Sequence, residues 1–171
     1  MKNVILIGMP GCGKTTVIDL CKQLHGREVW DTDEYIESTH GKISDIFAKF
    51  GEEYFRNIET EAVWEICKKD NCFISTGGGC VMREENVRIF KESGTIIYLK
   101  AKIETLLNRL EGDNSRPLLF GNKGERLAEL FNMRAPVYES VADIVIDTDG
   151  LTPQEVLENI FIKLNGKIGR V

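Results

Sequence analysis

The segment GMPGCGKT at residues 8–15 constrains this chain more than any other part of the sequence. It follows a short apolar run, Val4 to Ile7, whose residues favour a buried strand. It precedes a stretch in which apolar residues recur at three- and four-residue spacing from Val17 to Leu24, as in an amphipathic helix. A glycine-rich turn between a strand and a helix, ending in Gly-Lys-Thr, is typical of a loop that holds phosphate groups. The sequence therefore predicts a nucleotide-binding loop within an α/β fold.

The residue types of this loop suit a nucleoside triphosphate bound with magnesium. Glycines allow successive backbone N–H groups to converge on phosphate oxygens, and the N-terminus of the following helix adds a partial positive charge. We expect Lys14 to reach the β- and γ-phosphates and the hydroxyl of Thr15 to coordinate the metal. A glycine-rich turn that binds nothing is the alternative, and the motif alone leaves kinase, GTPase switch, ATPase and motor open. The expected nucleotide contacts are Gly11, Cys12, Gly13, Lys14, Thr15 and Thr16.

Strand-like and helix-like segments alternate along the chain. This alternation predicts a parallel sheet with helices on both faces and with ligands gathered at the carboxyl ends of the strands. The chain has 171 residues and shows no internal repeat or linker, so we expect a single domain over residues 1–171. The expected strands are Val4–Ile7, Phe73–Ser75 and Thr95–Leu99, with weaker candidates at Val29–Trp30 and Ile144–Ile146.

Charge and cysteine content limit the partners. The formal net charge of -5 gives no overall positive field for nucleic acid or an anionic membrane surface, so an anion must be held by local basic residues. The five cysteines are odd in number and form no C-x-x-C pair, as expected for free thiols in the cytoplasm. The segment before Gly8 is too short for an export signal or a membrane span. We expect a cytoplasmic monomer that acts on a small molecule, with no nucleic-acid or membrane partner.

Two carboxylates, Asp31 and Asp33, follow the strand candidate that ends at Trp30. If the strand geometry continues, both side chains point to the same side and face the phosphate loop. One carboxylate can hold magnesium through its waters, and the other can take the proton of an attacking hydroxyl. Ordinary turn and helix-cap residues are the alternative interpretation, because Asp and Thr are common in both places.

Glycines and arginines mark a second group. Residues 77–79 are three consecutive glycines that close a strand, which implies the close approach of another group, with a ligand as the simplest candidate. Arg56 and Glu59 lie three residues apart on an otherwise apolar helix, and Arg134 comes just before Pro136, which we expect to end a helix. Each arginine alone can be a surface charge. Together, near a phosphate loop, they suit an acceptor with a carboxylate group.

The segment Glu111–Glu125 contains three glycines and Pro117 but few apolar residues. This composition predicts a mobile loop, and a loop of this length in a compact enzyme is often a lid.

Taken in order, the motifs GMPGCGKT, DTD, FRNIE, TGGG, RPLL and MRAPVY resemble those of the shikimate kinases over almost the whole chain. The resemblance implies the nucleoside-monophosphate-kinase-like branch of P-loop folds, with a five-stranded parallel sheet. It also implies a helical substrate-binding region at about residues 32–60 and a mobile lid at about residues 111–125. Enzymes of this family use ATP and Mg²⁺ to convert shikimate to shikimate 3-phosphate, on the route to chorismate and the aromatic amino acids.

The resemblance also assigns roles to single residues. Asp33 would act as the base toward the 3-hydroxyl, while Lys14 and the lid residue Arg116 would stabilise the charge that develops on the γ-phosphate. The shikimate-binding set would be Asp33, Arg56, Gly78, Gly79 and Arg134. The magnesium positions would be Thr15 and Asp31, and the residues flanking adenine would be Arg109 and Pro153.

Three other functions stay open at this point. A kinase of the same branch for gluconate or a nucleotide differs from this reading only in the DTD, triple-glycine and paired-arginine motifs. A GTP-dependent switch would read guanine with N-K-x-D, but residues 122–125 read NKGE and fall in the expected lid. A non-catalytic scaffold would lack the acid or the lid arginine, and the sequence has both.

Overall fold

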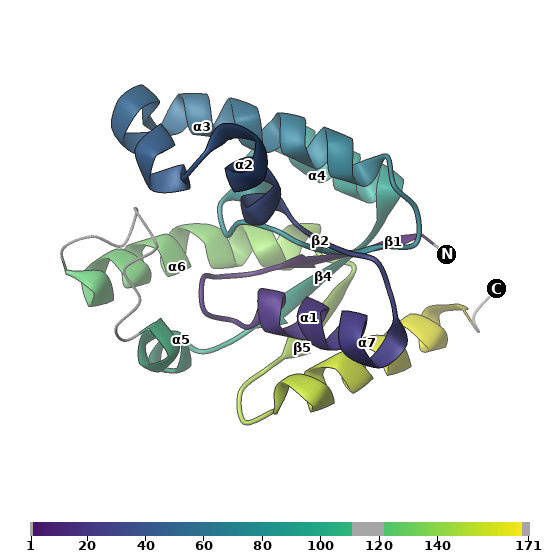
Figure 1. Cartoon of the computed structure of the whole chain (residues 1–171). Helices are drawn as coiled ribbons and strands as arrows, with labels where there is room; N and C mark the ends of the chain where they lie inside the picture. Colours follow the sequence, from purple (N-terminus) through teal and green to yellow (C-terminus); the bar gives the residue numbers. More distant parts are fainter. Residues whose placement is uncertain (1, 111–121, 169–171) are drawn as a thin grey trace.

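The computed structural model describes residues 2–110 and 122–168, and in this part of the chain five parallel strands form one sheet with the order β2-β3-β1-β4-β5 (Figure 1). Every strand expected from the sequence is present and extends at most one residue beyond either predicted end. The expected parallel α/β fold is therefore confirmed. The strands are β1 (Asn3–Ile7), β2 (Val29–Asp31), β3 (Phe73–Ser75), β4 (Gly94–Lys100) and β5 (Ile144–Asp147).

Helices cover both faces of the sheet. Figure 1 shows α1 and α7 packed together on one side, and α3 and α4 on the other. The helices are α1 (Lys14–His25), α2 (Thr32–His40), α3 (Ile43–Cys67), α4 (Glu84–Ser93), α5 (Ile103–Leu110), α6 (Lys123–Val141) and α7 (Pro153–Ile168), with a short 3₁₀ turn η1 (Cys80–Met82). Among the described residues, no helix combines the length and the apolar character that crossing a membrane requires.

The central strand β1 explains why the sheet forms where it does. All of its residues are buried, because β3 and β4 flank it and helices cover both of its faces. A continuous apolar run such as VILI suits a strand of this kind, whereas an alternating pattern would place polar side chains in the core. The register pairs Leu6 with Ser75, and Ser75 in turn with Asp31. The segments that follow β1, β2 and β3 therefore meet at one edge of the sheet.

Side chains of α2 and α3 form a second, smaller apolar cluster, apart from the main core. Phe55 is buried there with its ring 4.7 Å from that of Phe47, so both residues belong to the packing of this helical region. α3 changes direction at Gly51, whose φ of 81° lies in the left-handed region. The cluster consists of Ile36, Ile46, Phe55, Ile58 and Ala62.

The expectation that Pro136 ends a helix was wrong. Pro136 lies inside α6, which continues to Val141. A proline has no N–H to donate to the carbonyl of Asn132, four residues earlier, and this normally weakens a helix. Asn132 and Pro136 are both exposed, so water can hydrate that carbonyl, and the residues beyond the proline stay helical.

The expected lid ends earlier than the sequence indicated. α6 begins at Lys123, so residues 123–125 are helical. Asn122 caps this helix by accepting a hydrogen bond of 3.4 Å from the backbone N of Glu125, which is a common role for asparagine. Asn122 is thus the helix cap of the NKGE segment. The rest of the expected lid, with Arg116, lies outside the described residues.

Candidate active site

The phosphate loop runs from the carboxyl end of β1 to the first turn of α1. Gly13 occupies the N-cap position of α1 with a φ of 98°, which a residue with a side chain adopts only with strain. Lys14 is almost fully buried, and its ammonium group donates hydrogen bonds to the carbonyls of Gly8 (2.9 Å) and Met9 (3.1 Å). The strand, the glycine-rich loop and the helix therefore follow one another as predicted, and the lysine is held against the backbone of its own loop.

Asp31 connects the phosphate loop to the end of β2. Its Oδ2 accepts a hydrogen bond of 3.0 Å from the hydroxyl of Thr15. Its Oδ1 accepts from the backbone N of Asp33 (2.9 Å) and of Glu34 (3.4 Å) and so caps α2. Asp31 and Thr15, the two expected magnesium positions, thus lie in direct contact.

The sequence was right that Asp31 and Asp33 face the same space, but wrong about the cause. Asp33 does not continue the strand, because α2 begins at Thr32 and Asp33 belongs to its first turn. The capping carboxylate of Asp31 ends the strand and starts the helix at once. Both carboxylates then line one cavity from the end of β2 and the start of α2.

A cavity of about 450 Å³ lies over the phosphate loop. Arg109 reaches it from α5 and donates a hydrogen bond of 3.3 Å to the carbonyl of Gly11, while Pro153 borders it at the start of α7. Every described residue that we expected to contact nucleotide or magnesium lines this cavity, namely Gly11, Cys12, Gly13, Lys14, Thr15, Thr16, Asp31, Arg109 and Pro153.

Several lining residues were missed by sequence reasoning. Ser75 and Thr76 lie at the carboxyl end of β3, and Thr148 directly follows β5. Their position at strand ends is a signal that the sequence contained, because ligands gather at that edge of a parallel sheet. The apolar lining residues had no such signal. They are Val17, Leu110, Leu151 and Val156.

The triple glycine is packed against the side chains of the second group. A Cβ on Gly77 would lie 2.8 Å from Oδ1 of Asp33, and a Cβ on Gly78 would lie 3.1 Å from Nη1 of Arg134. A Cβ on Gly79 would collide with the guanidinium of Arg56. The close approach that the sequence ascribed to a ligand is therefore made by the protein's own side chains. The five residues expected to bind the acceptor come together around this loop.

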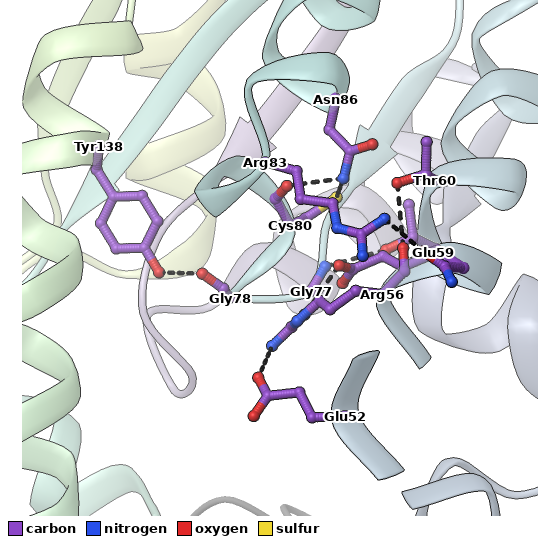
Figure 2. A network of polar contacts seen from close by, with 12 residues as sticks. Glu52, Arg56, Glu59, Thr60, Gly77, Gly78, Cys80, Arg83, Asn86 and Tyr138 are labelled. Atoms are coloured by element: carbon purple, nitrogen blue, oxygen red, sulfur yellow. Dashed lines mark hydrogen bonds and ion pairs between the residues drawn. The ribbon is translucent and has the colours of Figure 1, made fainter. Parts of the chain in front are cut away.

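Glu59 is the main residue of this group that the site prediction omitted. It is fully buried on α3 and accepts a hydrogen bond of 2.8 Å from Nη1 of Arg56, while Nη2 of Arg56 donates to Glu52 at 3.1 Å (Figure 2). The pKa of Glu59 is raised to about 7, because the effect of burial, with a smaller one from Asp33, outweighs the lowering by Arg56 and Arg134. Its three-residue spacing from Arg56 on an otherwise apolar helix was the available signal, and this spacing was noted in the sequence without a role being given to Glu59.

Two buried polar atoms of this group find no hydrogen-bond partner among the described residues. They are Oε1 of Glu59 and Nε of Arg134. Buried polar atoms are nearly always paired with protein or water, and an unpaired one calls for an explanation. A polar ligand bound in this cluster is one such explanation. The cluster offers a guanidinium donor beside a carboxylate acceptor, and a polar ligand could pair with both.

Asp33 joins the two halves of the site. It lines the nucleotide cavity together with Lys14 and Thr15, and it also lies against Gly77 in the arginine cluster. An acceptor held by Arg56 and Arg134 would therefore lie beside a carboxylate that also borders the triphosphate cavity. This is an arrangement for transfer of a phosphoryl group to a small anionic molecule.

Comparison with known proteins agrees with this geometry. The model of the family described as Shikimate kinase matches residues 10–165. The shikimate kinase of Thermodesulfovibrio yellowstonii is 47% identical over 162 residues, which is 94% of this chain and 93% of the relative. The shikimate kinase of Caldicellulosiruptor bescii is 42% identical over 162 residues, with 94% of each chain covered.

Solved structures extend the comparison to three dimensions. A shikimate kinase from Acinetobacter baumannii in complex with shikimate superimposes with a TM-score of 0.93 at 34% identity, covering 98% of this chain and 94% of that one. The enzyme from Aquifex aeolicus superimposes with a TM-score of 0.83 at 32% identity, covering 99% of both chains. With its ordered motifs, its two-part site and these relatives in agreement, the chain belongs to the shikimate kinase family.

Proposed function

We propose that this protein transfers the γ-phosphoryl group of ATP to the 3-hydroxyl of shikimate, giving shikimate 3-phosphate and ADP. The observation that carries this proposal is the position of Asp33, which borders the nucleotide cavity and also the cluster that contains Arg56 and Arg134. Family membership supports the same acceptor, because the related structure from Acinetobacter baumannii is a complex with shikimate.

Acceptor binding relies on the two arginines and the triple glycine. Arg56 and Arg134 bring guanidinium groups from α3 and α6, and a guanidinium binds a carboxylate through two parallel hydrogen bonds. The backbone of Gly78 and Gly79 lies between them and offers N–H groups to the ring hydroxyls. The carboxylate of shikimate is thereby held at one end, and its hydroxyls are directed toward Asp33.

Asp33 is proposed to orient the 3-hydroxyl and to take its proton as the bond to phosphorus forms. Phosphoryl transfer needs little covalent chemistry from the protein, so catalysis comes mainly from positioning and from charge stabilisation. Lys14 would stabilise the γ-phosphate from the phosphate loop. Arg116 would do so from the lid segment that precedes α6, whose closure would exclude water and limit hydrolysis of ATP.

The residues beside the phosphate loop fit a magnesium ion. Mg²⁺ prefers oxygen ligands and is commonly bound through one or two carboxylates together with phosphate oxygens and water. The hydroxyl of Thr15 and the carboxylate of Asp31 supply such oxygens, 3.0 Å apart, at the wall of the cavity. Within residues 2–110 and 122–168, no group of three or more histidine, cysteine or acidic side chains forms a metal cage, so phosphates and waters would complete the coordination. When bound, the ion neutralises charge on the β- and γ-phosphates.

The wider setting is also a proposal. We place the enzyme in the cytoplasm as a monomer that needs neither nucleic acid nor a membrane, with one domain whose substrate-binding region covers about residues 32–60. All five cysteines are free thiols, which suits a reducing compartment, and the net charge of -5 does not favour polyanions. Light scattering on a sizing column would measure the oligomeric state directly.

The test of the proposed function is ADP release by purified protein with ATP and Mg²⁺. Shikimate, gluconate, AMP and buffer without acceptor are compared under identical conditions. We expect strong stimulation by shikimate alone. Equal release with every acceptor, or stimulation by gluconate or AMP instead, would overturn the proposal.

A further inference from the structure

Tyr138 is a buried polar residue that the proposed mechanism does not use. It lies on α6, and its side chain points to the triple glycine, where its hydroxyl donates a hydrogen bond to the carbonyl of Gly78 (Figure 2). Its ring packs on that of Tyr98, with 5.1 Å between the ring centres. A buried tyrosine hydroxyl that reaches a specific backbone atom contributes more than apolar packing, because it fixes the position of its partner.

The partner, Gly78, belongs to a segment whose backbone must be held in place by its surroundings. Residues 77–79 have no side chains, and glycine has more conformational freedom than any other residue. Backbone hydrogen bonds hold the neighbouring carbonyls, since Gly77 O accepts from Cys80 N and Gly79 O accepts from Met82 N, each at 3.0 Å. The carbonyl of Gly78 lies between these two and is held by Tyr138.

Holding this carbonyl also sets the direction of a backbone donor. The peptide unit is planar and trans, so the carbonyl of Gly78 and the N–H of Gly79 belong to one rigid plane and point in opposite directions. When Tyr138 binds the oxygen on one side, the N–H of Gly79 is directed to the other side. A Cβ on Gly79 would collide with the guanidinium of Arg56, so the acceptor cluster lies directly beside this residue.

Tyr138 also stands next to the second arginine of the site. Arg134 lies four residues earlier on α6, on the same face of the helix. Its Nη1 lies 3.1 Å from the place that a Cβ on Gly78 would take. Burial raises the pKa of the Tyr138 hydroxyl well above its usual range, while the charge of Arg134 lowers it. The hydroxyl therefore remains a donor at every pH at which the enzyme would work.

We propose that Tyr138 is a positioning residue for the acceptor: its hydroxyl holds the peptide between Gly78 and Gly79 and directs the N–H of Gly79 at the substrate. It thereby fixes the position of this donor relative to Arg134. This inference rests on the proposed function, because it takes shikimate as the acceptor. Tyr138 does not contact the reacting atoms, and its effect is carried by the backbone of the triple glycine.

The test is Tyr138→Phe, which keeps the ring and its packing and removes only the hydroxyl. The matched control is Tyr98→Phe, which removes a hydroxyl from the neighbouring buried ring on β4. For Tyr138→Phe we expect the KM for shikimate to rise about tenfold, with the KM for ATP within about twofold of the wild type. Titration calorimetry with shikimate should show the same loss of affinity, and Tyr98→Phe should match the wild type in both measurements.

Two results would overturn the inference. One is a KM for shikimate in Tyr138→Phe that equals that of Tyr98→Phe. The other is an equal rise in the KM values for shikimate and ATP together with a lower melting temperature, which is the signature of a general structural defect. The wild-type protein is assayed first: if it failed to phosphorylate shikimate, the proposed function itself would fall, whereas an active wild type with an unaffected variant would refute only the role of Tyr138.

Discussion

Arg56 donates a hydrogen bond of 2.8 Å to the fully buried carboxylate of Glu59, three residues further along α3. This ion pair holds the guanidinium against the backbone of the triple glycine, where a Cβ on Gly79 would collide with it. A buried charge pair is expensive to desolvate and costly to break on one side only. This contact should therefore affect both the stability of the protein and its binding of the acceptor.

Replacing Glu59 by Gln should change how stability depends on pH. Because burial raises the pKa of Glu59 from the ordinary 4.5 to about 7, the folded protein binds this proton more tightly than the unfolded chain does. The contribution of Glu59 to the free energy of unfolding is therefore greatest below pH 4.5 and falls as the pH rises through about 7. As the pH rises from 4.5 to about 7, the free energy of unfolding of the wild type should fall by roughly 3 kcal/mol relative to that of Glu59→Gln.

Urea denaturation of both proteins at a series of pH values measures this difference. Glu53→Gln, an exposed carboxylate on the same helix, is the control and should run parallel to the wild type. Parallel profiles for the wild type and Glu59→Gln would show that folding does not raise the pKa of Glu59 and that the argument from burial is wrong.

Gly79→Ala should weaken shikimate binding selectively. The new Cβ would collide with the guanidinium of Arg56 and push it out of the position that Glu59 sets. We expect the KM for shikimate to rise by about tenfold or more, with little change in the KM for ATP, because the nucleotide cavity is not altered. Steady-state kinetics with each substrate varied in turn gives both constants.

Gly166→Ala is the matched control for that substitution. Gly166 lies in α7, and a Cβ there would have no neighbour within 4 Å. Alanine in a helix should raise stability by up to about 1 kcal/mol and leave both KM values unchanged. If Gly79→Ala behaved like Gly166→Ala, the contact with Arg56 would have no part in substrate binding.

The site could be predicted from the sequence where a local pattern carries the chemistry, and it could not where distant segments meet. The phosphate loop, its strand and its helix are adjacent in the chain, so spacing alone placed Lys14 and Thr15. Asp31 was placed at the end of its strand, and the helix cap that the sequence offered as the alternative is also present, because Asp31 accepts from the backbone N–H groups of α2. What the pattern of residue types did not show is that one side chain fills both roles. The same limit applied to Pro136, which remains helical because its turn is exposed.

Long-range neighbours explain the remaining omissions. Tyr138 and Gly78 are 60 positions apart, and Glu59 meets the triple glycine from another helix. The sequence showed that something must approach residues 77–79, because three glycines in a row leave room for it. It could not show that the neighbours are side chains from α2, α3 and α6, since that depends on how the helices pack on the sheet.

Arg134→Lys tests the grip on the carboxylate. Lysine keeps the positive charge but lacks the planar fork that forms two parallel hydrogen bonds. We expect the KM for shikimate to rise about tenfold with a smaller change in kcat, since a positively charged group remains in the cluster. Arg88→Lys, an exposed arginine on α4, should have no effect on either constant. An unaltered KM in Arg134→Lys would remove this residue from the carboxylate site.

Asp33→Asn tests the proposed base. The amide is nearly the same size and can still contact a hydroxyl, but it cannot take a proton at neutral pH. Turnover should fall by about two to four orders of magnitude, while the affinity for ATP stays close to that of the wild type. Single-turnover kinetics and calorimetry with an ATP analogue separate these effects, and Asp19→Asn, an exposed carboxylate on α1, is the control. Near-normal turnover in Asp33→Asn would exclude Asp33 as the base.

The most direct test of the whole account is to identify the product formed from ATP and shikimate by phosphorus and proton NMR. The account predicts a phosphate ester whose phosphorus couples to the proton at carbon 3 of the ring, appearing in step with ADP, because Asp33 lies between the nucleotide cavity and the arginine cluster. Release of inorganic phosphate alone, or an ester at another hydroxyl, would contradict the proposed arrangement of acceptor and base.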